Sequence, residues 1–337
     1  MIKTYGVVIK TIGPVHIGCG ETLKKQDYIY DYHESTVHYV DGPKLIKYLK
    51  NKGVLDKYLS FMRKPPKGHP REAELKTFLN SVKISKQDWS HFIDFSIPVN
   101  QGKKNSSNKS KPLNDITLMI RDGQKSVYIP GSTLKGAIKT ALLAIQNNAD
   151  DKRLYSKLKV SDSLPIENSS LAIYEKIDVN KTDKPMPLYR ECIDIGTEIN
   201  TTITIEDDAF SIKEIEDAIK YFFDNYQKKW LDGFTHSAIA RKVLKETMPN
   251  KNNIVYLGGG PGFVSKTLQY QLYSIDKAKE EIFNVLSRRF KWSYGKFKSI
   301  PKNVPIALKV THNQKEQKWY QQGMCEISFY QTEKEKE

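Results

Sequence analysis

The sequence predicts an α+β fold made of two units that each combine strands and helices. Strand-like and helix-like segments follow one another as strand, helix, strand, strand, which differs from the regular alternation of a doubly wound sheet. The length of 337 residues also corresponds to roughly two ordinary domains. We expect one domain at 1–190, with an insertion at about 57–115, and a second domain at 191–337.

In the first half, apolar and polar residues alternate over 2–10 and predict a strand, and further strands are expected at 27–32 and 36–41. A helix is expected to begin at Gly42-Pro43, because proline is tolerated in the first turn of a helix.

The polar, lysine-rich segment 101–112 separates two more predicted strands, at 92–99 and 116–120. Two interpretations remain open for it. It is either the tip of a long hairpin or a plain loop.

The clearest predicted element is a helix that begins at Thr133, after a short strand at 126–129. Its apolar residues recur at helical spacing, which is typical of a buried amphipathic helix. Ser132 is expected to be the N-cap, since a serine hydroxyl accepts hydrogen bonds from N–H groups of the first turn. Lys135 and Lys139, four residues apart, share another stripe of this helix.

The second half contains a capping box, formed by Ser211 and Glu214, at the start of a long amphipathic helix. The other elements expected there are strands near Cys192 and at 198–205, 254–257 and 325–330, and a helix at 276–289.

Several classes of protein are excluded or disfavoured. No segment approaches the roughly 18 apolar residues of a membrane helix, and the N-terminus lacks the apolar region of a signal peptide. The three cysteines, Cys19, Cys192 and Cys325, are too far apart for a CxxC site and too few for a disulfide framework. We therefore expect a cytoplasmic protein without a membrane partner, a cofactor or a metal.

Charge is the strongest compositional signal. The chain has 54 Lys and Arg against 39 Asp and Glu, a net charge of +15. Such a balance favours a polyanionic partner, most commonly nucleic acid. The alternative is a basic surface that only maintains solubility.

The glycine-rich loop 258–262 fits neither phosphate-binding template. Ser265 stands where both the Walker sequence and the dinucleotide fingerprint require glycine. The loop does allow close approach of its backbone to a phosphate or a base, because no Cβ intervenes. It is interpreted either as an RNA-contacting loop or as a flexible turn.

The segment 287–302 interleaves basic and aromatic residues and contains no acid. Basic groups bind phosphates, and aromatic faces stack on unpaired bases. The same spacing also fits a packed strand with solvated lysines. The basic residues singled out here are Arg288, Arg289, Lys291 and Lys296.

Catalysis finds little support in the sequence. The seven histidines are scattered and show no metal-ligand spacing. His16, in a glycine-rich turn, is the one candidate for a general base in RNA cleavage.

Three segments in order resemble the RAMP superfamily of CRISPR-associated proteins: GPVHIGCG at 13–20, IPGSTLKGAIKTALL at 129–143 and LGGGPGFVSKT at 257–267. Within the superfamily, the chain is similar to the fifth subunit of type III-A (Csm) effector complexes. The resemblance implies two ferredoxin-like, RRM-like domains with basic insertions. It also implies a non-catalytic subunit that caps the backbone filament at the 3′ end of the CRISPR RNA (crRNA) and supports crRNA 3′-end maturation in antiviral defence.

The resemblance further implies partners and contact residues. The partners would be the 3′ region of the crRNA, target RNA, the backbone RAMP subunit, the small helical subunit and host trimming nucleases. Segment 101–112 would be the thumb inserted into the guide–target duplex. The RNA-facing candidates that the resemblance implies are His16, Gly18, Gly131, Ser132, Lys135, Lys139, Gly258, Gly259 and Gly260. Lys266 and the four basic residues of 287–302 are further RNA-binding candidates, which the resemblance does not supply.

Two alternative functions stay open at this point. The first is a metal-independent endoribonuclease that processes CRISPR repeats with His16 as general base. The second is the backbone RAMP subunit that adjoins the 5′ handle.

Overall fold

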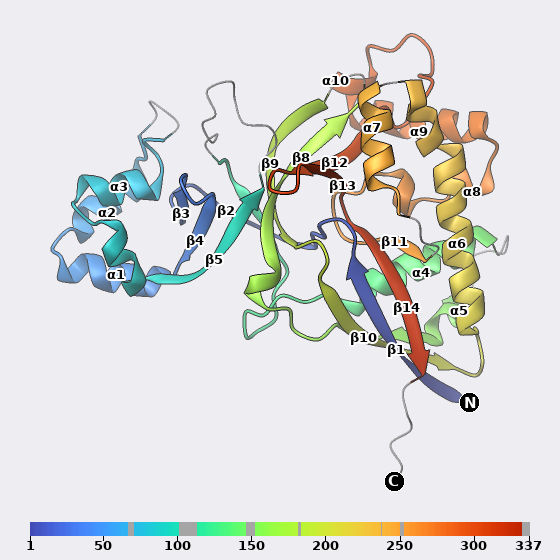
Figure 1. Ribbon diagram of the computed structural model, residues 1–337, viewed down its shortest axis with the longest axis horizontal. Helices are drawn as coiled ribbons and strands as arrows, with labels where there is room; N and C mark the ends of the chain where they lie inside the picture. Colours follow the sequence, from blue (N-terminus) through green and yellow to red (C-terminus); the bar gives the residue numbers. More distant parts are fainter. Residues whose placement is uncertain are drawn as a thin grey trace.

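The computed structural model describes residues 1–66, 71–100, 113–145, 152–180, 183–236, 238–249 and 253–331. These residues form a five-stranded and a nine-stranded sheet. In Figure 1 a small helical arm extends to the left of a larger body, which contains the five-stranded sheet and most of the helices.

The five-stranded sheet joins the two ends of the chain. Its strands, in spatial order, are β11 (Ile254–Tyr256), β14 (Met324–Gln331), β1 (Ile2–Thr11), β10 (Glu198–Glu206) and β7 (Leu158–Val160), and all neighbours are antiparallel. Helix α4 (Gly131–Ile145) lies between β1 and β7 in sequence, and α6 (Ile212–Lys229) lies between β10 and β14. Leaving out β11, the strands of this sheet and these two helices follow one another along the chain as β-α-β-β-α-β.

Alternation of apolar residues explains which face of this sheet is covered. In β10, Ile199, Thr201, Ile203 and Ile205 are buried, while the alternate residues are more exposed. The three isoleucines share a core with Leu134 of α4 and Ile215 of α6. The predicted capping box is confirmed, since the Ser211 and Glu214 side chains each accept a hydrogen bond from the other's backbone N–H.

The second sheet has the order β2-β6-β9-β8-β5-β4-β3, and β12 pairs with both β8 and β13. Its strands are β2 (Gly18–Leu23), β3 (Tyr28–Asp31), β4 (Thr36–Val40), β5 (Ile93–Asn100), β6 (Ile116–Met119), β8 (Leu171–Val179), β9 (Asp183–Ile193), β12 (Leu308–Asn313) and β13 (Lys318–Gln321).

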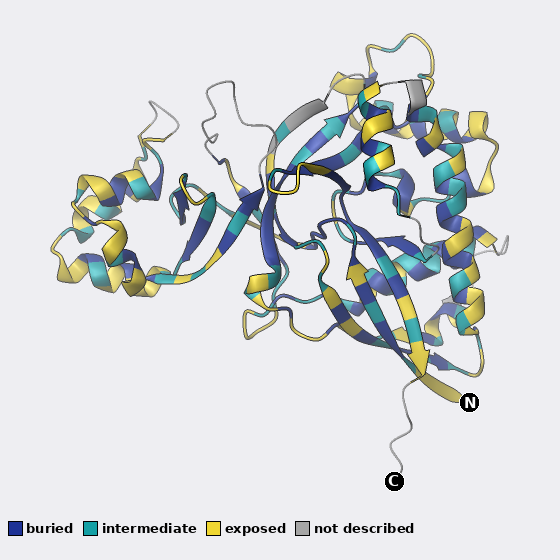
Figure 2. Cartoon of the chain, in the orientation of Figure 1, coloured by how far each residue is buried: buried dark blue, intermediate teal, exposed yellow. Residues whose placement is uncertain are grey.

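The helical arm lies between β4 and β5. It consists of α1 (Gly42–Asn51), α2 (Leu55–Arg63), α3 (Leu75–Ser81) and the 3₁₀ helix η1 (Lys86–His91). Asp41 caps α1 by accepting a hydrogen bond from the Lys44 N–H. The arm has its own core, which includes Leu45, Leu79 and Trp89, and Figure 2 shows its outer surface exposed.

The remaining helices are α5 (Lys152–Ser156), α7 (Ala238–Thr247), α8 (Gln269–Leu272), α9 (Ile275–Arg289) and α10 (Lys291–Tyr294). Residues of α7, α9 and α10 contribute to a separate core with β12 and part of α6. Within the described ranges, no helix combines the length and the apolar character needed to cross a membrane.

Three expectations meet a different structure. The strands that flank segment 101–112 exist, but β9 and β8 separate β6 from β5, so these two strands do not form a hairpin; the segment itself lies outside the described residues. Segment 126–129 forms isolated bridges at Val127 instead of a strand. Strand β9 crosses the boundary expected at residue 190, and β1 pairs with strands from beyond it. The division into two domains therefore stays a prediction.

Candidate nucleic-acid interface

The glycine-rich loop packs backbone against backbone on the turn that contains His16. The Gly259 N–H donates a hydrogen bond to the His16 carbonyl oxygen at 2.6 Å. Gly258 has a φ of +69°, and a Cβ there would lie 2.0 Å from the same oxygen. Two of the predicted RNA-facing segments therefore pack against each other, and the close contact of the loop backbone with the His16 carbonyl oxygen requires glycine at position 258.

An arginine that the sequence analysis missed lies beside this loop. A Cβ on Gly260 would lie 2.2 Å from Gln322 Oε1 and 2.9 Å from Arg190 Nη1. Arg190, in β9, donates a hydrogen bond to Gln322 Oε1 at 3.0 Å. The available signal was one arginine next to Glu191 in this strand, which does not by itself indicate a binding residue.

Lys266 also contacts the loop, since its ammonium donates a hydrogen bond to the Gly258 carbonyl oxygen. Both residues line a cavity of about 380 Å³ between α4, α6, β11 and the loop. Helix α4 lines it with small and hydroxyl-bearing residues, among them Thr133, Gly136 and Thr140. None of these three was singled out from the sequence, although all lie in the run that carries the family resemblance.

His16 is buried and uncharged at neutral pH. Its side chain is held by Nδ1–H, which donates to the Glu191 carbonyl oxygen at 2.7 Å, since a carbonyl can only accept. Burial lowers the pKa of His16 to about 4, against the opposing effect of this hydrogen bond. A Cβ on Gly18 would lie 2.9 Å from His16 Nε2. The imidazole is thus a weak base that cannot form an ion pair with a phosphate at neutral pH.

The start of α4 differs from the prediction. The helix begins at Gly131, whose N–H donates to the Asp162 carboxylate at 2.7 Å, and Ser132 is exposed. The expected Ser132 N-cap is therefore wrong, because a side chain distant in sequence takes that place. A Cβ on Gly131 would lie 2.1 Å from the Val160 carbonyl oxygen. The Asp162 carboxylate also occupies the position that a helix N-terminus offers to an anion.

The two lysines of α4 are half-buried and do not line the cavity. Lys139 Nζ lies 5.0 Å from the ring centroid of Tyr155, a cation–π distance. The structure therefore does not place Lys135 or Lys139 in the cavity beside the glycine-rich loop.

The basic and aromatic segment 287–302 forms a separate surface. It contains the end of α9 and the short helix α10, so it is not a packed strand. Its aromatic residues divide between two roles: Tyr294 is buried and Trp292 is 99% exposed. The four basic candidates of this segment are exposed. Figure 1 places α10 at the upper edge of the body, apart from α4 and β11.

Comparison with known proteins agrees with this architecture. The RAMP superfamily profile matches residues 8–265. The CRISPR system Cms protein Csm5 of Enterococcus italicus is 41% identical over 347 residues, which cover 97% of each chain. Csm5 of Streptococcus thermophilus is 28% identical and is matched over 79% of this chain and 80% of its own length.

Two solved structures share the fold. A chain in the cryo-EM structure of a type III-A Csm–crRNA–target RNA ternary complex has a TM-score of 0.66 at 18% identity, and the match covers 97% of this chain and all 100% of that one. The crystal structure of T. onnurineus Csm5 has a TM-score of 0.57 at 19% identity, with 81% and 96% covered. On the sequence matches, the chain belongs to the RAMP superfamily and, within it, to the family of the CRISPR system Cms protein Csm5.

Proposed function

We propose that this chain is a non-catalytic, RNA-binding subunit of a type III-A Csm complex, which caps the backbone filament at the crRNA 3′ end. The observation that carries the proposal is the 41% identity to a Csm5 protein over nearly the whole length of both chains. A net charge of +15 supports an RNA partner, because lysine and arginine neutralise phosphates.

Within this role, the glycine-rich loop and its neighbours form the principal RNA contact. Arg190 and Lys266 supply positive charge beside the loop, which attracts the phosphates of RNA. The exposed basic residues around Trp292 form a second contact, in which the indole stacks on an unpaired base.

The environment of His16 supports a scaffold over a nuclease. A general base works best when its pKa lies near the operating pH, whereas burial lowers the pKa of His16 to about 4. A repeat-processing endoribonuclease, the alternative function, would cleave RNA, so the experiment includes a test for cleavage.

The experiment uses the purified full-length chain and end-labelled single-stranded RNA, in Mg²⁺ and in EDTA, on native and denaturing gels. We expect a shift without cleavage in both conditions. If about six phosphates are neutralised, the logarithm of the affinity should fall against the logarithm of the salt concentration with a slope of about −4. Discrete cleavage in EDTA that His16→Ala abolishes would overturn the proposal, and a slope near zero would contradict a phosphate-based contact.

The position at the crRNA 3′ end is tested in the assembled complex. The proposed protein partners are the backbone RAMP subunit, the small helical subunit and the trimming nucleases. We expect crosslinks from the glycine-rich loop to the 3′ part of the crRNA, and longer crRNA 3′ ends in complexes that lack this chain. Crosslinks to the 5′ handle would instead indicate the other backbone position.

A further inference from the structure

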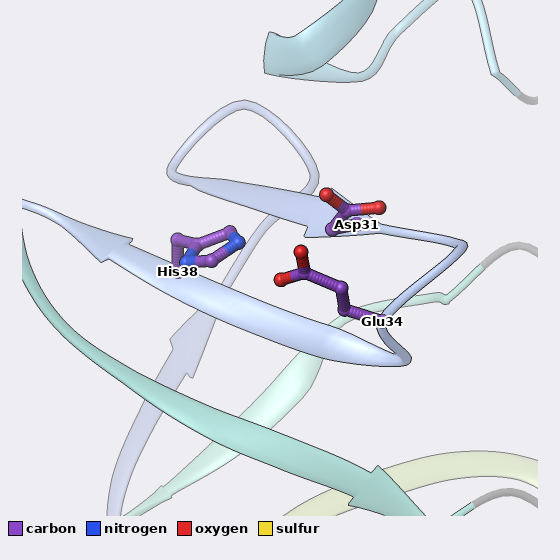
Figure 3. A group of neighbouring side chains, drawn as sticks. All are labelled: Asp31, Glu34 and His38. Carbon is purple, nitrogen blue, oxygen red and sulfur yellow. The ribbon is translucent and has the colours of Figure 1, made fainter. Parts of the chain in front are cut away.

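The β3–β4 hairpin brings together three side chains that are known metal-ligand types. Asp31 is the last residue of β3, Glu34 lies in the turn and His38 lies in β4. Figure 3 shows the three side chains converging on one side of the hairpin. One ligand atom from each lies within 4.8 Å of the other two. This separation is close to what a shared metal ion requires after small side-chain movements.

His38 has an unused nitrogen at this place. The residue is only 8% exposed, and its Nδ1 forms a hydrogen bond with Ser96 Oγ at 2.7 Å. Nε2 is buried without a hydrogen-bond partner, and Figure 3 shows a ring nitrogen directed toward the two carboxylates. A buried polar atom without a partner is costly, so its presence points to a ligand. Burial lowers the pKa of His38, which keeps the imidazole in the neutral form that binds metals.

A positive charge already occupies the space between the carboxylates. Lys86 Nζ lies 2.9 Å from Asp31 Oδ2 and also contacts Glu34 Oε1, and Lys76 Nζ lies 3.6 Å from Asp31 Oδ1. Burial alone would raise the pKa of Asp31, but the hydrogen bonds from Lys86 and the His33 N–H, with the charges of both lysines, lower it to about 2. The side chain of Lys86 is 54% exposed, so it can turn outward into solvent when another cation arrives.

We propose that Asp31, Glu34 and His38 form a binding site for a first-row divalent transition-metal ion such as Zn²⁺, which displaces the Lys86 ammonium. One imidazole nitrogen with two carboxylates favours such an ion over Mg²⁺ or Ca²⁺, which prefer oxygen ligands alone. Ser96 orients the imidazole through Nδ1, as a hydrogen-bond partner behind a metal ligand does. Water completes the coordination on the exposed side of Glu34.

A bound ion would link β3, the turn and β4 to one another, and it would release Lys86, which belongs to η1 of the helical arm. It lies on elements that carry none of the RNA-binding candidates named above. The inference is therefore independent of the proposed function, and it is tested on the free chain without RNA.

The test is a titration of the full-length chain with Zn²⁺ in competition with a chromophoric chelator, and with Co²⁺ followed by its d–d absorption. We expect one ion per chain, and a loss of affinity of about tenfold or more in Ser96→Ala. His38→Gln should abolish the nitrogen-ligated Co²⁺ spectrum. Lys86→Met should bind Zn²⁺ several-fold more tightly, because the competing ammonium is removed.

The Lys86 variant separates a metal site from a set of ion pairs. If the carboxylates serve only as lysine partners, Lys86→Met gains no affinity, and this result overturns the proposal. His33→Gln is the matched control, since His33 is exposed in the same turn and is expected to leave binding unchanged. Equal losses in the His33 and His38 variants, or no binding by the wild-type chain, would also overturn it.

Discussion

Gly258 and Gly53 have the same backbone φ of +69°, but only Gly258 is tightly surrounded. A Cβ on Gly53 meets nothing within 4 Å. Gly53→Ala should therefore lower the free energy of unfolding by about 1 kcal/mol, the cost of the left-handed conformation alone. Gly258→Ala adds the clash with the His16 carbonyl and should cost about 2–4 kcal/mol. Urea denaturation measures both values, and equal losses would contradict the observed packing of the loop.

His16 makes stability depend on pH. Its pKa is about 4 in the folded chain against an ordinary value of 6.5, so the unfolded chain binds the proton more readily. Protonation of His16 at low pH therefore favours the unfolded chain. The stability that depends on neutral His16 is complete above the pKa of His16 in the unfolded chain and is lost as the pH falls toward its pKa in the folded chain. Between about pH 7.5 and about pH 5, the wild-type chain should lose about 2 kcal/mol more than His16→Gln.

Urea denaturation of both chains at the two pH values measures this difference. The lowered pKa of His38 acts in the same direction and is common to both chains. If His16→Gln loses as much stability as the wild type, His16 is not held in its neutral form by burial.

At the scale of elements, the start of α4 depends on a residue from the segment after β7. Asp162→Ala removes the carboxylate that accepts from the Gly131 N–H and should cost about 1 kcal/mol, the usual value of a helix cap. Ser132→Ala should change stability by less than about 0.5 kcal/mol, as expected for an exposed side chain. Thermal or urea unfolding of the pair distinguishes the two caps, and the reverse order would restore Ser132 as the cap.

Helix α10 presents one aromatic residue to solvent and buries another two positions later. Trp292→Ala should leave stability unchanged and should weaken binding of single-stranded RNA by about 1–3 kcal/mol, the value of one stacked base. Tyr294→Ala is the control, because removal of this buried ring should destabilise the fold by about 3 kcal/mol. Fluorescence anisotropy with labelled RNA measures the affinity. Unchanged affinity in Trp292→Ala would remove α10 from the RNA-binding surface.

At the scale of the whole molecule, β1 depends on strands that follow residue 190. Its neighbours in the sheet are β10 and β14. We therefore expect that fragments 1–190 and 191–337 do not fold separately, since the first would expose both edges of β1 and the second would lack its central strand. Near-UV circular dichroism and urea denaturation of each fragment check this. Cooperative unfolding of both fragments would support the predicted division into two domains.

Most individual elements could be predicted from the sequence because local periodicity reports local conformation. The helix after Ser211, the strand at 198–205 and the terminal strand are confirmed. The sequence of segment 287–302 is compatible with a binding surface and with a packed strand. Periodicity did not reveal that its two central aromatics face opposite environments, because burial there depends on contacts with other helices.

The sequence by itself determined the basic charge, the α+β class and the family, since these depend on composition, periodicity and motifs. Only the tertiary structure decided which strands pair, that Asp162 caps α4 and that Arg190 lies beside Gly260. The physical reason is that strand partners, distant caps and side chains across a loop are selected by packing among residues far apart in the chain. Local patterns specify a residue's own backbone conformation and its buried face, and they carry no information about which distant segment covers that face.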